Sequence, residues 1–130
     1  MKIVTAAIIK KDDSYLITQR ASNDKLPLKW EFPVGKVEMS ETPEECLKRE
    51  IKEELNLDIV VGEKVATSIY RYDSGEIKLV AFSAEIIGGS MKLLIHHDAR
   101  WVNINQLDQF DFCPADIAVV NKILGEYLSY

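Results

Sequence analysis

The chain has little cysteine and no long apolar segment, and each shortage excludes a class of protein. Its 130 residues include two cysteines, Cys46 and Cys113, which are far apart and belong to no CxxC or Cys/His cluster. A disulfide scaffold or a zinc site is therefore not expected, and we expect both thiols to be small buried side chains in a reducing compartment. No stretch approaches the roughly 20 apolar residues of a membrane helix, so we expect no membrane partner.

The chain also lacks an excess of basic residues. It has 21 acidic and 16 basic residues and a net charge of −5. Because proteins bind nucleic acid polymers mainly through Lys and Arg that neutralise phosphates, we expect no such polymer as a partner. Residues 36–58 contain four bases and eight of the acids, namely Glu38, Glu41, Glu44, Glu45, Glu50, Glu53, Glu54 and Asp58. This window carries −4, and the other 107 residues carry −1.

The length and composition predict one compact domain over residues 1–130. Hydrophobic residues make up 47% of the chain, which excludes disorder of the whole chain. The apolar N-terminus resembles a short signal peptide, but residues 10–13 are charged and no small-residue cleavage site precedes them. We therefore expect a first strand there and a cytoplasmic protein.

Apolar, β-branched runs separated by turn residues predict most of the strands. The expected strands are residues 2–10, 15–19, 59–72, 76–87 and 100–103. Residues 30–37 are expected to form a short extended segment that Pro33 and Gly35 interrupt. Gly88-Gly89 is expected to end the strand over residues 76–87. A last helix is expected over 115–128, with one buried side formed by Ile117, Val120, Ile123, Leu124 and Leu128. Strands around a central helix, with a helix at the end, predict an α/β or α+β sandwich.

The clearest helix begins near Thr42. This residue can cap the helix, Pro43 suits the first helical position, and Glu45 completes a capping box. Asn56 suits the left-handed residue that ends a helix. A buried stripe is expected from Leu47, Ile51 and Leu55, which are four residues apart.

Three glutamates on this helix are candidates for a metal site. Glu50, Glu53 and Glu54 cluster on a side of the helix distinct from the buried stripe. Like charges at this spacing repel each other, and they lie toward the helix C-terminus, where the helix dipole disfavours anions. A bound cation would offset both effects, and hard carboxylate oxygens favour Mg²⁺ or Mn²⁺. The alternative is a solvated surface helix in which Lys48 and Lys52 pair with the acids.

The surrounding residues favour the metal site. The stretch runs from Gly35 through Glu41 to the segment Arg49-Glu50-Ile51-Lys52-Glu53-Glu54-Leu55-Asn56-Leu57. It resembles the Nudix box, Gx5Ex7REUxEExGU, in which U is an aliphatic residue. Every fixed position matches except Asn56, which stands where the family has Gly.

The resemblance to MutT-type members of the Nudix family extends beyond the box. Residues 30–38, Trp-Glu-Phe-Pro-Val-Gly-Lys-Val-Glu, are similar to the family's entry into the box, with Val34 in place of the first Gly. Gln19-Arg20, Trp101-Val102 and residues 112–116 also have counterparts. The resemblance implies the Nudix α/β/α sandwich, with a mixed β-sheet between helices. One departure is Ile95, which stands where many MutT-like proteins have a further metal-binding Glu. Asp98 and His96 are candidates to replace that acid, although paired loop histidines are more commonly exposed polar residues.

The activity that the resemblance implies is Mg²⁺-dependent hydrolysis of a nucleoside triphosphate to a monophosphate and pyrophosphate. Metal ligands would be the Gly35 carbonyl, Glu50, Glu53 and Glu54. Glu53 is expected to accept the proton of the attacking water, with Glu50 and Glu54 as alternatives. The other assigned residues are Arg49 as an orienting residue of the catalytic group, Glu41 as a structural tie, and Arg20, Lys36, Phe32 and Asp116 as substrate-binding residues.

Several of the substrate-binding assignments have a structural alternative. Arg20 and Lys36 suit phosphate but also an ordinary charged surface. Phe32 can stack on a base or belong to the core, as can Tyr72 and Phe82. Asp116 can read a base or cap the last helix.

The identity of the base stays open at this point. A carboxylate accepts hydrogen bonds only, so Asp116 favours a base edge with donors, such as the N4 amine of cytosine. Residues 114–117 resemble the CTP pyrophosphohydrolase branch, which points to CTP, dCTP or a modified dCTP. An oxidised guanine nucleotide such as 8-oxo-dGTP also offers donors. A nucleotide-sensing Nudix module without catalysis and an acidic protein-interaction domain are alternatives of other classes, and we expect a monomer or a homodimer.

Overall fold

The computed structural model describes the backbone of residues 1–128 and the side chains of residues 1–126. Its elements follow each other in the order β1 (Lys2–Lys11), β2 (Ser14–Gln19), β3 (Trp30–Glu31), β4 (Val34–Lys36), α1 (Pro43–Leu55), β5 (Leu57–Tyr72), β6 (Gly75–Gly89), β7 (Asp98–Asn103), a 3₁₀ helix (Ile104–Gln109) and α2 (Pro114–Leu128). Each strand and helix expected from the sequence is present, with ends shifted by one or two residues. The 3₁₀ helix, which buries Ile104 and Leu107, was not expected.

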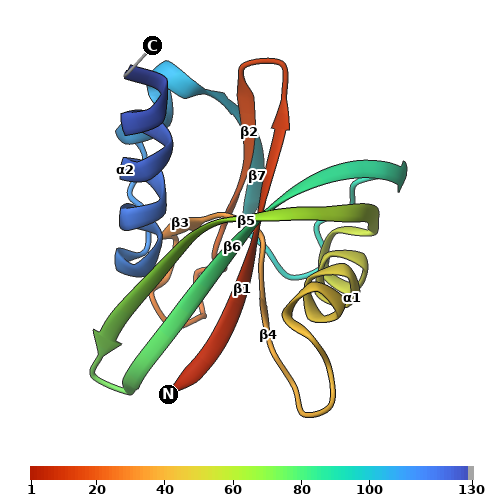
Figure 1. Ribbon diagram of the computed structural model, residues 1–130, viewed down its shortest axis with the longest axis vertical. Coiled ribbons are helices and arrows are strands. Elements are labelled where there is room, and N and C mark those ends of the chain that lie inside the picture. Colours follow the sequence, from red (N-terminus) through yellow and green to blue (C-terminus); the bar gives the residue numbers. More distant parts are fainter. Residues whose placement is uncertain (129–130) are drawn as a thin grey trace.

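The seven strands form one mixed sheet between the two helices (Figure 1). Its order is β3-β2-β1-β6-β5, and β4 and β7 pair with β1 and β2 respectively. β1 and β6 are parallel, whereas the other pairs are antiparallel. Because side chains alternate along a strand, Ala6 and Ile8 of β1 pack in the core under α2, whereas Ala7 and Ile9 pack in the core under α1. The α/β/α sandwich with a mixed sheet is thereby confirmed.

Helix α1 has the ends that the sequence predicts. The hydroxyl of Thr42 accepts a hydrogen bond from the Glu45 N–H at 3.1 Å, and the Glu45 carboxylate accepts one from the Thr42 N–H at 2.9 Å. Asn56 closes the helix in the left-handed conformation, with φ 57° and ψ 36°. The predicted stripe of Leu47, Ile51 and Leu55 is fully buried. The buried stripe fixes the rotation of α1 about its own axis. The side of the helix that carries Glu50, Glu53 and Glu54 therefore faces away from the core.

Strand β6 continues through Gly88 and Gly89, which pair with Asp58 and Leu57 of β5. The expectation that Gly88-Gly89 would break this strand is therefore wrong. The reason is a close approach of backbones, because a Cβ on Gly89 would lie 2.3 Å from the carbonyl oxygen of Asn56. Gly89 also has a φ of +87°, which favours glycine.

Strand β5 forms one end of the main path of the sheet. Its pairing with β6 is irregular at three places, between Asp58 and Ile59, between Val61 and Lys64, and between Lys64 and Ala66. Such irregularities bend a strand and increase its twist.

Helix α2 begins at Pro114 and packs most of the expected side against the sheet. Its buried residues include Ala115, Val119, Val120 and Ile123, and Leu124 is half-buried. Ile117 is 46% exposed, so its predicted burial is wrong, and the side chain of Leu128 lies outside the described residues. Within the described part of the chain, no helix is both long and apolar enough to cross a membrane.

Candidate active site

The loop between β4 and α1 brings Gly35 against the acidic side of the helix. A Cβ on Gly35 would lie 2.4 Å from Cγ of Glu50, so only glycine lets the strand and the helix approach this closely. The Gly35 carbonyl oxygen accepts a hydrogen bond from the buried Thr5 hydroxyl at 3.3 Å. Two of the predicted metal ligands, one backbone oxygen and one carboxylate, therefore belong to residues in direct contact.

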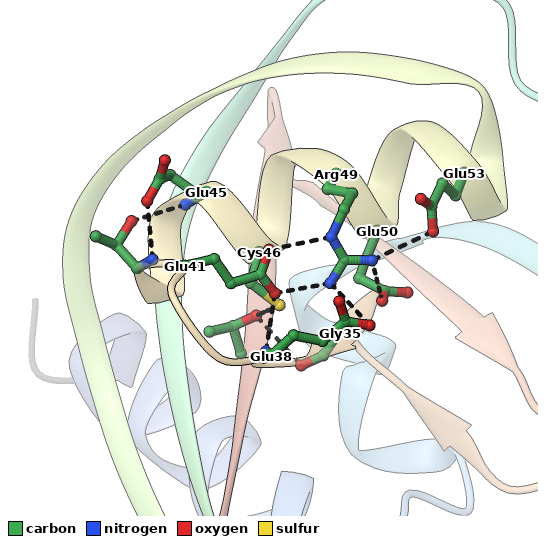
Figure 2. Close-up of polar contacts among 10 residues, drawn as sticks. Gly35, Glu38, Glu41, Glu45, Cys46, Arg49, Glu50 and Glu53 are labelled. Atoms are coloured by element: carbon green, nitrogen blue, oxygen red, sulfur yellow. Dashed lines mark hydrogen bonds and ion pairs between the residues drawn. The ribbon is translucent and has the colours of Figure 1, made fainter.

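Arg49 lies at the centre of the acidic segment, residues 36–58, and forms ion pairs with four of its carboxylates, those of Glu38, Glu41, Glu50 and Glu53 (Figure 2). Its Nε and Nη2 donate to the two oxygens of Glu41 at 3.1 and 2.7 Å. Its Nη1 donates to Glu50 at 2.7 Å and to Glu53 at 3.3 Å. The guanidinium of Arg49 and the backbone N–H of Glu38 lower the pKa of Glu41 to about 2. Glu41 thus ties the loop to the helix, in the place the sequence predicts.

Glu54 is the most perturbed of the predicted metal ligands. Burial and the adjacent Glu50 carboxylate raise its pKa to about 8, because two close carboxylates resist ionising together. Glu53 is different, since its side chain is 60% exposed and its carboxylate lies against Arg49. The structure therefore brings Gly35, Glu50 and Glu54 together, and Glu53 lies on the outer side of Arg49.

The donor set fits a hard divalent cation such as Mg²⁺ or Mn²⁺. Two neighbouring carboxylates and one backbone carbonyl are all oxygen ligands, and a cation would remove the repulsion that raises the pKa of Glu54. In the part of the chain that the structure describes, no three Asp, Glu, His or Cys side chains already converge on one point.

A cavity of about 420 Å³ is lined in part by Val34 and Lys36 of β4, which flank Gly35, and by Ala115 and Asp116 at the start of α2. Its lining combines charged and apolar side chains, among them Arg20, Glu31, Lys36, Tyr72 and Asp116. A cavity of this size with a few convergent polar groups suits a small organic ligand. Three of the four predicted substrate-binding residues, Arg20, Lys36 and Asp116, line it.

Asp116 lies in the first turn of α2 and is 3% exposed. Its predicted role as a helix cap is wrong, because the helix begins two residues earlier and its carboxylate instead accepts the Phe32 backbone N–H at 3.0 Å. Burial and the nearby Glu31 raise its pKa well above the ordinary value. Phe32 itself is fully buried and its ring stacks on Phe112, with centroids 5.6 Å apart. The ring of Phe32 therefore belongs to the core and presents no face on which a base could stack, which corrects its substrate-binding assignment.

Arg20 is held by its neighbours at the edge of the cavity. Nη1 contacts Glu31 at 3.1 Å, Nη2 contacts Asp24 at 3.0 Å, and Nε donates to the Lys25 carbonyl at 2.6 Å. Lys36 is exposed at the cavity mouth, and its ammonium group lowers the pKa of Lys2. Arg20 therefore has a fixed orientation, and Lys36 provides a positive charge that faces solvent.

Sequence reasoning missed Glu31, which is 6% exposed and lines the cavity. Burial raises its pKa to about 7, although Arg20 opposes this shift. The sequence offered one signal for this residue, because Glu31 stands between the aromatic residues Trp30 and Phe32. Two large apolar neighbours favour burial, and a buried charge is costly unless it is paired.

The side chain of His96 is also buried, contrary to the expectation of an exposed loop histidine. Its side chain is 5% exposed, and its Nε2 lies 4.0 Å from Oε2 of Glu31. Burial lowers its pKa. It lines a second cavity of about 130 Å³ together with Glu54. Asp98, the other candidate for the acid missing at Ile95, instead pairs with Arg100 at 3.0 Å.

Comparison with known proteins agrees with this geometry. Residues 1–122 match the model of the NUDIX domain. The chain is 34% identical to the CTP pyrophosphohydrolase of Escherichia coli strain K12 over 123 residues, which are 94% of this chain and 90% of the relative. It is 28% identical to the 8-oxo-dGTP diphosphatase of the same organism over 123 residues, which are 95% of each chain.

A solved structure with a similar fold is the DNA mismatch repair protein MutT, of the Nudix hydrolase family, from methicillin-resistant Staphylococcus aureus 252. The two chains are 42% identical, the TM-score is 0.76, and the match covers 96% of each chain. Both the core elements and the segment around Arg49 therefore lie within the matched region.

Proposed function

The chain belongs to the Nudix family, and on that premise we propose that it hydrolyses a nucleoside triphosphate to a nucleoside monophosphate and pyrophosphate, with Mg²⁺ or Mn²⁺ as cofactor. The observation that carries this proposal is the contact between Gly35 and Glu50, next to Glu54, beside a cavity that suits a nucleotide. A triphosphate is densely anionic, so its hydrolysis requires positive charge and precise positioning at the phosphate chain.

We assign different roles in this hydrolysis to different residues. Gly35, Glu50, Glu53 and Glu54 would hold the cation, which when bound supplies charge neutralisation to the phosphates. Arg49 orients Glu50 and Glu53 through hydrogen bonds. We propose that Glu53, Glu50 or Glu54 accepts the water's proton, and the position of Glu54 in a cavity wall supports Glu54. Arg20 and Lys36 would contact the phosphate chain from the other side.

We further propose a cytidine-type base, CTP, dCTP or a modified dCTP. Glu31 and Asp116 both line the cavity, and a carboxyl group, whether ionised or neutral, can accept a hydrogen bond from an exocyclic amine such as N4 of cytosine. The name of the Escherichia coli relative, a CTP pyrophosphohydrolase, supports this choice. An oxidised guanine nucleotide is the second candidate, supported by the relative named 8-oxo-dGTP diphosphatase.

The test is a panel of canonical, methylated and oxidised nucleoside triphosphates incubated with the protein and Mg²⁺. We expect pyrophosphate and the monophosphate as products, with the highest kcat/KM on a cytidine nucleotide. Release of orthophosphate alone, or no turnover of any nucleotide, would overturn the proposed reaction. A preference for 8-oxo-dGTP would overturn the cytidine assignment and leave the reaction intact. Tight binding with no product over hours would instead identify a nucleotide-sensing module.

A further inference from the structure

Three exposed lysines, Lys2, Lys25 and Lys36, gather at the larger cavity, and we call them the lysine cluster. Lys25 and Lys36 line this cavity. Lys2 belongs to the same face of the sheet as Lys36, because Val4 pairs with Lys36 and side chains two residues apart on a strand share a face. The nearby ammonium groups of Lys36 and Lys25 both lower the pKa of Lys2. The three positive charges are therefore close neighbours at one edge of the cavity.

The lysine cluster has no anionic partner in the described part of the chain. The cavity lining includes the carboxyl groups of Glu31, Asp73 and Asp116, but no described carboxylate forms an ion pair with any of the three lysines. Arg20, by contrast, is paired with both Glu31 and Asp24. Neighbouring like charges repel each other, and a phosphate relieves this repulsion through charge-assisted hydrogen bonds. The cluster therefore suits a phosphate group.

The lysine cluster and the predicted metal ligands lie on opposite faces of β4. Val34 and Lys36 line the larger cavity, whereas a Cβ on Gly35 between them would meet the Glu50 side chain. Successive side chains of a strand point to opposite faces, so the Lys36 side chain leaves the strand on the face away from Glu50. A phosphate at the lysine cluster is thus a different group from a phosphate beside Glu50 and Glu54.

The two cavities define a path that a nucleotide can follow between these positions. Arg20, Glu31 and Val34 line both the larger cavity and the cavity of about 130 Å³ that Glu54 lines. With the base in the larger cavity, a 5′-phosphate chain would pass these three residues to reach Glu54. The base carries no negative charge, and the 5′ chain leads away from the lysine cluster. The ribose is the remaining part of a nucleotide that can carry a phosphate to the cluster.

We propose that the lysine cluster binds a second phosphate on the ribose, so that the site takes nucleotides that carry a 3′-phosphate as well as a 5′-phosphate chain. Lys2 and Lys25 are then specificity-determining residues. Lys36 lines the cavity on the same face as Val34, where it can contact either phosphate group. The 3′-phosphate takes no part in the hydrolysis and stays on the product. The orientation of the nucleotide rests on the proposed function, but binding to the cluster can be measured without turnover.

Calorimetry with matched ligands in Mg²⁺ tests this inference. The ligand pairs are cytidine 5′-monophosphate against cytidine 3′,5′-bisphosphate, and the same pair for guanosine, the second candidate base. We expect the bisphosphate of at least one base to bind the wild type about 10-fold or more tightly than its monophosphate. High salt should reduce this ratio, because it screens exposed charges.

The double variant Lys2→Gln, Lys25→Gln should reduce the ratio to about threefold or less, since Lys36 remains. Both lysines are exposed, so we expect the Tm of this variant to match that of the wild type. Lys11→Gln, at the exposed other end of β1, is the matched control and should keep the wild-type ratio.

Binding and turnover separate this inference from the proposed function. If the wild type releases no pyrophosphate from any nucleotide but prefers a bisphosphate through Lys2 and Lys25, the proposed function fails and the phosphate site stands. Equal dissociation constants within both pairs, no binding of either pair, or the wild-type ratio in the double variant overturn the inference alone. It is also overturned if the double variant weakens cytidine 5′-diphosphate relative to the monophosphate and leaves the bisphosphate ratio unchanged. The cluster would then serve the 5′-phosphate chain.

Discussion

Gly35 is the residue at which the site depends most directly on the absence of a side chain. Its backbone is extended and has no positive φ, so the requirement for glycine comes from neighbouring side chains, mainly that of Glu50. A Cβ at this position would also meet Cβ of Glu50 at 2.7 Å and Sγ of Cys46 at 3.2 Å. Glu50 would have to leave its place beside Glu54.

Gly35→Ala is therefore expected to damage activity more than stability. We expect kcat to fall about 100-fold, because misplacement by 1 Å is enough for such a loss. The free energy of unfolding should fall by about 1–3 kcal/mol, as for other overpacked sites. Gly125→Ala is the control, since nothing lies within 4 Å of a Cβ there and the change should stabilise α2 by about 0.5–1 kcal/mol. Wild-type kinetics in Gly35→Ala would contradict the contact.

Glu31 gives the stability a specific dependence on pH. Its pKa is about 7 in the folded chain and near 4.5 when unperturbed, so the folded chain binds more protons between these values. The free energy of unfolding should therefore fall as pH rises from about 4.5 to 7. Glu31→Gln should make this decline shallower, and Asp116, whose pKa is also raised, should preserve part of it.

Thermal unfolding at pH 5 and pH 8 measures this effect. Glu44→Gln, at an exposed position in the first turn of α1, is the matched control and should show the wild-type decline. An identical decline in Glu31→Gln and the wild type would show that Glu31 titrates near its ordinary pKa in the folded chain.

At the scale of elements, the stability of α1 depends on its N-cap residue, Thr42, which precedes the first helical residue. Thr42→Ala removes the hydroxyl that accepts the Glu45 N–H and should cost about 1 kcal/mol. Thr42→Ser keeps a hydroxyl and should stay within a few tenths of a kcal/mol of the wild type. Urea unfolding monitored by circular dichroism measures both. Equal losses in the two variants would indicate that the methyl group of Thr42, and not its hydroxyl, stabilises the helix.

Local signals explain why α1 and the strands were predictable from the sequence. The cap at Thr42, the spacing of Leu47 and Ile51 and the left-handed Asn56 are all read within one segment. The errors concern contacts between segments distant in sequence. Gly89 is required by the backbone of Asn56, and Asp116 is used by Phe32, 84 residues away.

The site was predictable in part for the same reason. The box residues lie on β4, the loop after it and α1, which follow one another in the chain, so their spacing places them together. The burial of Glu31 and His96 depends on β2, β3 and the loop before β7, which meet only in the folded chain. No spacing in the sequence indicates that His96 and Glu54 line one cavity.

At the scale of the whole molecule, the localised negative charge predicts that a divalent cation stabilises the fold. A ligand present at ten times its dissociation constant adds about 1.4 kcal/mol to the free energy of unfolding, which for a chain of this size raises Tm by about 5 °C. Millimolar Mg²⁺ should produce this shift in the wild type and not in Glu54→Gln, with NaCl of equal ionic strength as the control. The same shift in both proteins would place the cation elsewhere.

Strand β5 affects how copies of the molecule can associate with each other. As the last strand of the sheet, it presents a row of backbone groups that β6 does not use, and such an edge is a template for aggregation. The three irregularities in its pairing interrupt that row, and two of them flank Lys64 near the middle of the strand. The regular edge is thereby shortened to residues 66–72, which pair with β6 without a shift. The bends that shape the sheet therefore also limit the length of edge on which a second chain could add a strand.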